Sequence, residues 1–176
     1  MGIKIRLATM NDEKRVFDLY RKVAAIPGGL ARIESEITPS YVHHNLTNAL
    51  STGICLLATN EHREVVGEIH AYRLTPKVFQ HVLSELTIAI DPDFQGQGVG
   101  KRLFTAFLDH VSHSLPQVYR VELIARESNE KAIQFYQKLG FEIEGKLKGR
   151  IFNHHNTLEA DVMMAWFNPY YLGFGQ

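Results

Sequence analysis

The sequence lacks most of the features that would take it out of the soluble globular class. It contains one cysteine, Cys55, so no intrachain disulfide can form. No apolar run approaches the ~20 residues of a membrane-spanning helix, and the N-terminal MGIKIRLATMNDEKR lacks a signal peptide's apolar core. Lysine plus arginine (19) balances aspartate plus glutamate (19), so no broad attraction to nucleic acid or anionic membranes arises. We expect a cytoplasmic protein with no nucleic-acid or membrane partner.

Hydrophobic periodicity predicts one mixed α/β domain over residues 1–176, because no repeat or linker interrupts the chain. We expect a mixed central sheet of about six to seven strands, antiparallel in its early part, flanked by about four helices. Cys55 lies in an apolar strand run and is expected to be a buried, inert thiol. The expected strands cover 3–8, 53–59, 64–74, 81–90, 119–126, 142–152 and 157–167, and the expected helices cover about 16–24, 39–50, 103–111 and 129–141.

Three glycines, Gly96, Gly98 and Gly100, separate a predicted strand from a predicted helix in the run SELTIAIDPDFQGQGVGKRLFTAF. A helix N-terminus offers unpaired N–H groups and about half a positive charge. Glycine lets the backbone approach phosphate oxygens without a side-chain clash. The turn is therefore predicted to bind an anionic group, and the glycine spacing must decide which one.

The spacing argues against two nucleotide motifs. A G-x-G-x-x-G fingerprint would need its third glycine at position 101 or 103, where Lys101 and Leu103 stand. A Walker A loop would need a glycine in place of Gln95 and a serine or threonine in place of Arg102. A nucleotide-binding domain is thus a weak rival, and it predicts tighter binding of ATP or NAD than of coenzyme A.

Two segments together resemble the GNAT superfamily of N-acetyltransferases. The first is the Q-x-x-G-x-G turn that begins at Gln95, and the second has the pattern N-x-x-A-x-x-x-Y-x-x-x-G-F over Asn129, Ala132, Tyr136 and Gly140-Phe141. The strong match runs from about Val82 to Trp166. Its last part is similar to a branch that acetylates small amines, amino acids and protein N-termini.

The resemblance implies acetyl-CoA as co-substrate and no metal. The turn would hold the pyrophosphate, the backbone of the preceding strand would hold the pantetheine arm, and Asn129 and Tyr136 would lie along that arm. Asn129 has the alternative role of a helix N-cap. The residues expected at the coenzyme are Ile88, Ala89, Ile90, Gln95, Gly96, Gln97, Gly98, Val99, Gly100, Lys101, Asn129 and Tyr136, with Arg102 as a further cation.

Glu85 and Tyr136 are the expected catalytic residues. By resemblance, Glu85 takes the proton from the amine and Tyr136 protonates the leaving thiolate. Strict alternation would place Glu85 on one face of its strand with Thr87 and Ala89. An exposed or salt-bridged strand glutamate and a tyrosine that packs its helix are the structural alternatives. No acyl-enzyme is expected, because no activated nucleophile is visible.

The expected reaction is acetyl transfer to a primary amine by direct attack; the alternative is a non-catalytic acyl-CoA binding or sensing module. Residues 26–45 and the loops near 75–81 would bind the acceptor, with Glu34, Glu36 and the turn residues His154 and His155 as candidates. The nine histidines lack the H-E-x-x-H spacing, so no metal site is expected. The apolar tail WFNPYYLGF could pack on a second subunit of a homodimer or close its own core.

Overall fold

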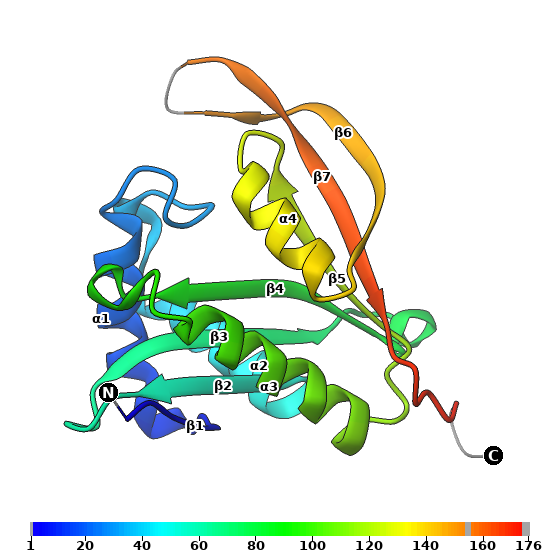
Figure 1. Ribbon diagram of the computed structural model, residues 1–176, viewed down its shortest axis with the longest axis horizontal. Coiled ribbons are helices and arrows are strands. Elements are labelled where there is room, and N and C mark those ends of the chain that lie inside the picture. Colours follow the sequence, from blue (N-terminus) through cyan, green and yellow to red (C-terminus); the bar gives the residue numbers. More distant parts are fainter. Residues whose placement is uncertain (1, 154–155, 174–176) are drawn as a thin grey trace. The chain divides into compact units, whose positions relative to one another are not determined.

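Seven strands form one mixed sheet in the order β1-β2-β3-β4-β5-β7-β6 in a computed structural model that describes residues 2–153 and 156–173 (Figure 1). The predicted mixed sheet and helices are confirmed. The elements are β1 (Lys4–Leu7), α1 (Glu13–Ala24), α2 (Pro39–Thr52), β2 (Ile54–Thr59), β3 (Val65–Arg73), β4 (Val82–Ile90), α3 (Val99–Ser114), β5 (Arg120–Arg126), α4 (Glu130–Lys138), β6 (Glu142–Phe152) and β7 (Leu158–Phe167). Short 3₁₀ turns cover Met10–Asp12, Glu34–Glu36, Lys77–Phe79 and Pro92–Phe94.

The contacts within the chain gather in two compact units. Unit 1 comprises Met1–Arg73 and Thr87–His110, and unit 2 comprises Leu74–Leu86 and Val111–Gln176. Both β4 and α3 therefore contribute residues to each unit. The two units are described in turn.

Unit 1 is built on the antiparallel strands β1, β2 and β3, whose register pairs Leu57 with Glu68. Cys55 and Leu57 face a core cluster that includes Tyr20 of α1 and Leu46 of α2. The other face meets α3: the place of a Cβ at Gly67 lies 3.3 Å from Leu103. The sheet of unit 1 is thus covered by α1 and α2 on one face and by α3 on the other. Each fully buried aliphatic side chain contributes roughly 1.5–3 kcal/mol.

Cys55 is buried, as predicted, with 1% of its surface exposed. Burial, together with the nearby Glu68 carboxylate, raises the pKa of its thiol far above the usual range. The thiol therefore stays protonated, and its Sγ donates a hydrogen bond to Glu68 Oε1 at 3.1 Å.

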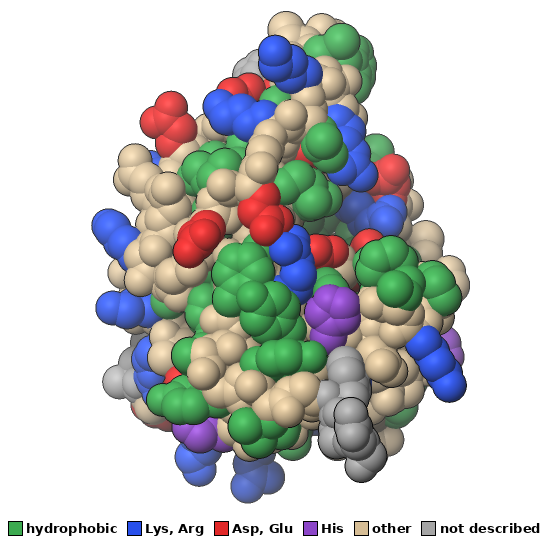
Figure 2. All heavy atoms as spheres, turned by 90° about the vertical axis from the view of Figure 1, so that its right-hand side faces the viewer, with side chains coloured by type: hydrophobic (Ala, Val, Ile, Leu, Met, Phe, Trp, Pro, Cys, Tyr) green, Lys and Arg blue, Asp and Glu red, His purple; other side chains and the backbone are tan. Residues whose placement is uncertain are grey.

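Unit 2 contains β5, which pairs antiparallel with β7, and β6, which pairs antiparallel with β7. Its helix α4 ends as predicted, with Gly140 in the left-handed region at φ +93°. The segment after β7 turns back onto its own unit: the buried Asn168 donates from Nδ2 to Val118 O at 2.9 Å, and Leu172 N donates to Pro116 O at 2.9 Å. Leu172 keeps 80% of its surface exposed, and the face drawn in Figure 2 carries hydrophobic side chains among charged ones.

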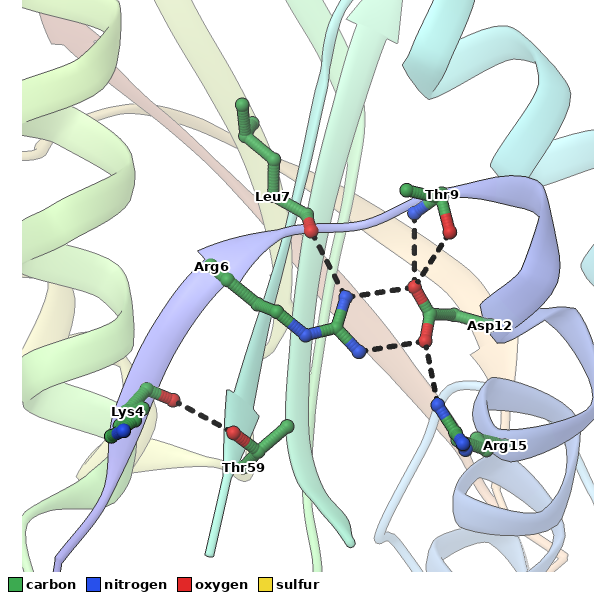
Figure 3. Close-up of polar contacts among 7 residues, drawn as sticks. All are labelled: Lys4, Arg6, Leu7, Thr9, Asp12, Arg15 and Thr59. Carbon is green, nitrogen blue, oxygen red and sulfur yellow. Dashed lines mark hydrogen bonds and ion pairs between the residues drawn. The ribbon is translucent and has the colours of Figure 1, made fainter. Parts of the chain in front are cut away.

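A buried carboxylate joins the start of α1 to β1 (Figure 3). Asp12, 2% exposed, accepts hydrogen bonds from Arg6 at 2.8 and 2.7 Å and from the Thr9 backbone N–H at 3.0 Å. Arg15 approaches the same carboxylate at 3.3 Å. These contacts, and above all the Arg6 hydrogen bonds, hold the pKa of Asp12 well below its usual range. The charge of Asp12 thus stabilises the folded chain.

We expect Asp12→Asn to destabilise the protein by about 2–3 kcal/mol, because charged hydrogen bonds to a buried group are lost. The depressed pKa makes this stabilisation complete above the unfolded-state pKa of about 3.9 and progressively lost as the pH falls below it. Urea unfolding between pH 2 and pH 7 measures the difference between wild type and variant, which should shrink below about pH 4.

Asp18→Asn is the matched control, because Asp18 pairs with Lys14 on the exposed side of α1. We expect it to cost less than about 0.5 kcal/mol. Equal costs for the two variants would contradict the role given to the buried carboxylate.

Candidate functional site

The predicted site residues fall into two groups, one in each unit. Unit 1 contains the end of β4, the glycine turn and the start of α3. Unit 2 contains Glu85 on the first part of β4 and Asn129 and Tyr136 at α4. The group in unit 1 consists of Ile88, Ala89, Ile90, Gln95, Gly96, Gln97, Gly98, Val99, Gly100 and Lys101.

The glycine turn requires two residues in the left-handed region. Gly96 has φ +72° and Gly98 has φ +79°, and apart from chain neighbours no described heavy atom lies within 4 Å of the place of a Cβ at either. The turn is exposed and leads directly into α3, whose first turn carries no acidic side chain. The first N–H groups of a helix have no intrahelical partner. This open, positively polarised backbone fits a phosphate group.

The two glutamines of the motif build the turn. Gln95 Nε2 donates to Ile90 O at 3.1 Å, and Gln97 Nε2 donates to Asp93 O at 2.9 Å. Arg102 is engaged as well, because its Nη2 donates to Ile3 O at 2.9 Å. Lys101 is exposed. An anion at this turn would therefore meet mainly backbone N–H groups and the Lys101 ammonium.

Lys22 of α1 holds the beginning of the turn, and the sequence analysis did not identify it. Its Nζ lies 2.7 and 2.9 Å from the two oxygens of Asp91 and 2.7 Å from Asp93 Oδ2. Asp91 also accepts from Asp93 N at 2.9 Å. The Asp-Pro pair after an apolar strand is the only signal in the sequence; its partner, 69 residues earlier, is visible only in the fold.

Beside this ion pair, unit 1 is hollowed by an open cavity of about 740 Å³. Its walls come from α1, from the turn between β2 and β3, and from the segment after β4; they include Arg15, Lys22, Val65, Asp91 and Phe94. The cavity lies next to the predicted anion site and has charged groups of both signs on its walls. It lies outside the set of predicted site residues.

Glu85 bends the backbone within β4. Its φ is +54°, and within unit 2 the parallel pairing of β4 with β5 covers Val82 and Leu83 and stops before it. The expected strict alternation through this strand is therefore wrong: Glu85 is exposed, whereas Ala89 has only 1% of its surface exposed. A residue at positive φ turns the backbone, so residues before and after it no longer alternate in phase. The exposed carboxylate is compatible with a base.

Asn129 is the N-cap of α4, which is the alternative role that the sequence predicted for it. Its Oδ1 accepts from Ala132 N at 3.2 Å, and its side chain is exposed, so the amide NH₂ remains available to a ligand. Seven residues later, Tyr136 lies about two turns further along α4. The N-cap role is confirmed, and the coenzyme contact stays a prediction.

Tyr136 is half-buried between the rings of Phe135 and Phe141, whose centroids lie 5.6 and 6.0 Å away. Burial raises the pKa of its phenol, so the hydroxyl keeps its proton at neutral pH. That protonation state is the one a proton donor needs. The packing role and the acid role are therefore compatible in this residue.

The other candidates have partners or lie outside the described part. Glu34 forms an ion pair with Arg21, and Glu36 accepts from Ile33 N at 3.1 Å, so neither carboxylate is free to attract a cationic amine by itself. His154 and His155 lie outside the described residues. Over residues 2–153 and 156–173, no three histidine, cysteine or acidic side chains gather as metal ligands. In the same ranges, no helix has the length and apolar composition of a membrane span.

Comparisons with known proteins agree on one family. The sequence profile of the acetyltransferase (GNAT) family matches residues 28–141, well over half of the chain. The chain is 35% identical over 92 residues to spermidine N(1)-acetyltransferase of Escherichia coli. The aligned segment covers 52% of this chain and 48% of that protein. It is also 35% identical over 104 residues to the ribosomal-protein-alanine N-acetyltransferase of Escherichia coli, covering 56% and 64%.

Among solved structures, the phosphinothricin acetyltransferase of Sinorhizobium meliloti in complex with AcCoA has a TM-score of 0.82 at 19% identity. That similarity covers 96% of this chain and 89% of the other, and it shows a shared fold. Among the curated relatives, this chain's matches span about half of the spermidine enzyme and less than two thirds of the ribosomal-protein enzyme.

The positive φ of Glu85 leads to a prediction about stability that can be tested without measuring activity. We expect Glu85→Gly to be at least as stable as the wild type, and Glu85→Val to be less stable by about 1–2 kcal/mol, because a β-branched residue is strained at positive φ. Thermal unfolding measures both. Thr87, on the same strand without a positive φ, is the control: there, valine should be more stable than glycine. If glycine and valine had the same order of stability at positions 85 and 87, the positive φ assigned to Glu85 would be contradicted.

Proposed function

Because the chain belongs to the acetyltransferase (GNAT) family, we propose that it is an N-acetyltransferase that transfers an acetyl group from acetyl-CoA to a primary amine. The observation that carries the proposal is the turn after β4, with Gly96 and Gly98 in the left-handed region at the start of α3. The acceptor is a small amine, an amino acid or a peptide N-terminus. Relatives named for spermidine and for a ribosomal-protein alanine fall within this range.

The coenzyme end of the proposal rests on unit 1. Pyrophosphate oxygens would accept from backbone N–H groups between Gln95 and Lys101, and the pantetheine arm would follow the backbone of Ile88–Ile90. Support comes from the exposed turn, from the absence of an acid in the first turn of α3, and from the structural neighbour in complex with AcCoA. Gln95 and Gln97 keep the turn in shape through their bonds to Ile90 and Asp93.

The chemistry is a direct transfer. The amine nitrogen attacks the thioester carbonyl carbon, the nitrogen–carbon bond forms, and the carbon–sulfur bond breaks with its electron pair on sulfur. Tyr136 donates its phenolic proton to the thiolate, and Glu85, or a water that it orients, takes the proton from the amine. Cys55 cannot act as a nucleophile, because it is buried and its raised pKa keeps the thiol protonated.

The need for a base depends on the acceptor. An alkylamine with a pKa of about 10.4 costs roughly 4–5 kcal/mol to deprotonate at pH 7, whereas an α-amine near 8 costs about 1 kcal/mol. We expect the segment 26–45, which joins α1 to α2 and includes the first half of α2, to select the acceptor, together with residues 75–81. A cytoplasmic location and a homodimer stay predictions. Light scattering tests the homodimer, because one chain has a mass of 20.0 kDa.

Thiol release from acetyl-CoA, measured with purified protein and a panel of amines, tests the proposal. The panel holds amino acids, polyamines, aminoglycosides and short peptides. Amine-dependent release is the expected result, and the best amine identifies the acceptor class. Tight acetyl-CoA binding in a calorimeter without release for any amine would favour the rival, a non-catalytic acyl-CoA binding or sensing module.

Tyr136→Phe should lower kcat by about 10²-fold, the usual contribution of a general acid. The affinity for acetyl-CoA should stay within about twofold of the wild type, because the ring and its packing remain. Steady-state kinetics and calorimetry give the two numbers. Tyr170→Phe, at a tyrosine with 60% of its surface exposed, is the matched control and should change neither. An unchanged kcat in the Tyr136 variant would remove its role as acid.

Gly98→Ala should weaken acetyl-CoA binding by about tenfold or more, equivalent to about 1.4 kcal/mol. The methyl group enters the open space of the turn, and alanine is strained at a φ of +79°. Gly145→Ala is the control, because space is equally open there and the φ is not in the left-handed region. Calorimetry compares the two. Equal affinities for acetyl-CoA would show that the turn does not hold the coenzyme.

A further inference from the structure

A buried carboxylate on β3 belongs to no part of the predicted site. Glu68 has 1% of its surface exposed and receives three donors. Its Oε1 lies 3.1 Å from Cys55 Sγ and 2.9 Å from His70 Nδ1, and its Oε2 accepts from the Tyr20 hydroxyl. His70, two residues along the strand, is buried as well, with 3% of its side chain exposed. Glutamate and histidine thus form a closed pair inside unit 1.

Such a pair is a poor choice for stability alone. Moving charged groups out of water costs several kcal/mol, and well-packed apolar residues of similar volume are often at least as stable. Among the described residues, no arginine or lysine forms an ion pair with Glu68. Its titratable neighbours are Tyr20 of α1, Cys55 of β2 and Tyr72 on β3, with Tyr41 and His44 of α2 behind them. From β4, the residues Thr87–Ile90 offer no titratable side chain.

The hydrogen bonds determine which nitrogen of His70 can accept a proton. Nδ1 lies 2.9 Å from Glu68 Oε1 and 3.1 Å from the oxygen of the Tyr20 hydroxyl, whose own hydrogen points at Glu68 Oε2. With both oxygens as acceptors, Nδ1 carries the hydrogen of the neutral ring. In the neutral ring, Nε2 then has the free lone pair. Among the residues that the structure describes, no hydrogen bond engages Nε2. A carboxylate behind Nδ1 and a lone pair at Nε2 is the arrangement of a general base, since the carboxylate stabilises the imidazolium that forms.

The register of the sheet places this base beside the predicted coenzyme arm. Asp91 N donates to Val66 O at 2.9 Å, and β3 and β4 run in opposite directions (Figure 1). In an antiparallel pair, moving two residues along each strand from that bond sets Glu68 opposite Ala89, and moving four residues sets His70 opposite Thr87. Ala89 belongs to the same core cluster as Tyr20 and Cys55, so these residues share the face covered by α1 and α2.

The position of Thr87 matters because of the direction of the coenzyme, and this step rests on the proposed function. With the phosphates at Gln95–Lys101 and the arm along Ile90 and then Ile88, the acyl end lies toward Thr87. The strand next to it presents His70. The segment between α1 and α2, where we expect the acceptor, joins the two helices that cover the same face.

We infer that His70, held by Glu68, takes the place of Glu85 as the group that receives the proton lost by the acceptor amine; the acetyl transfer of the proposed function is otherwise unchanged. In this step the nitrogen–carbon bond forms, the carbon–sulfur bond breaks, and sulfur keeps the electron pair. The nitrogen's proton passes to Nε2, directly or through water, and the imidazolium keeps its Nδ1–H on Glu68. His70 is a catalytic residue in this scheme, and Glu68 is a positioning residue.

Two aromatic rings lie between His70 and the surface of unit 1. Tyr72 stacks on His70 with ring centroids 6.1 Å apart and planes 6° apart. The exposed His44 of α2 meets Tyr72 edge-on at 6.4 Å. These rings pack around His70 and are no path for a proton; the imidazolium gives its proton to water once the products have left.

The first test needs no activity. Long-range ¹H–¹⁵N NMR of the wild type should show His70 with hydrogen on Nδ1 and a bare Nε2 at high pH, and both nitrogens protonated at low pH. The bare Nε2 should gain its proton at lower pH in Glu68→Gln, because the imidazolium loses its counter-charge. A ring with hydrogen on Nε2 and a bare Nδ1, or no response to Glu68→Gln, would overturn the inference.

The second test uses the pH dependence of kcat/KM for the best amine. His70→Gln should lower kcat/KM about 100-fold at pH 7 and remove the acid limb of the profile, with acetyl-CoA affinity within about twofold. Glu68→Gln should shift that limb to lower pH. Glu85→Gln should keep the acid limb of the profile. His62→Gln, at an exposed histidine outside the predicted site residues, is the matched control and should leave the profile unchanged.

The outcomes separate this inference from the proposed function. A wild type that releases thiol, with an acid limb that persists in His70→Gln and vanishes in Glu85→Gln, would overturn the inference alone. A wild type that binds acetyl-CoA and acetylates no amine would overturn both. If His70→Gln does not fold, the NMR titration and the limb shift in Glu68→Gln decide.

Discussion

One ammonium group between two carboxylates determines how β4 ends. Lys22 of α1 contacts both oxygens of Asp91 and one of Asp93, while Asp91 also accepts from the backbone of Asp93 and its own N–H bonds Val66. These bonds stop the strand, begin the 3₁₀ turn and set the direction in which the chain enters the glycines. A turn with two residues at positive φ has few contacts of its own, so its shape depends on what holds its ends. Unit 1 supplies that support from a helix far away in sequence.

Unit 1 buries two carboxylates in different ways, and the difference separates structure from chemistry. Asp12 faces Arg6 and Arg15, whose charges do not titrate, and it ties β1 to the start of α1. Glu68 faces a histidine, whose ring can gain and lose a proton, and a tyrosine and a thiol that stay protonated and donate hydrogen bonds. The first arrangement stays the same at every working pH. The second can store and release a proton, and for that reason we assign it to the reaction and not to folding.

The elements themselves followed from local patterns. Apolar spacing placed the seven strands and four helices, Gly140 marked the end of α4, and Asn129 was correctly considered as its cap. The strict alternation through Glu85 was wrong, because a positive φ at a glutamate leaves no trace in the residue type. The roles of Glu85, Tyr136 and the coenzyme residues stay predictions, supported by exposure at Glu85 and by the raised pKa of the Tyr136 phenol.

By itself the sequence determined the mixed α/β architecture, the glycine turn before α3 and the family resemblance, because these depend on residue type and on spacing over a few residues. Only the tertiary structure brought Lys22 to Asp91, Tyr20 to Glu68 and Cys55 to the same carboxylate. Such contacts join residues 69, 48 and 13 positions apart. They depend on strand register and helix placement, which result from packing of the whole core. The order of the elements predicts that a core forms; the packing decides which polar groups meet inside it.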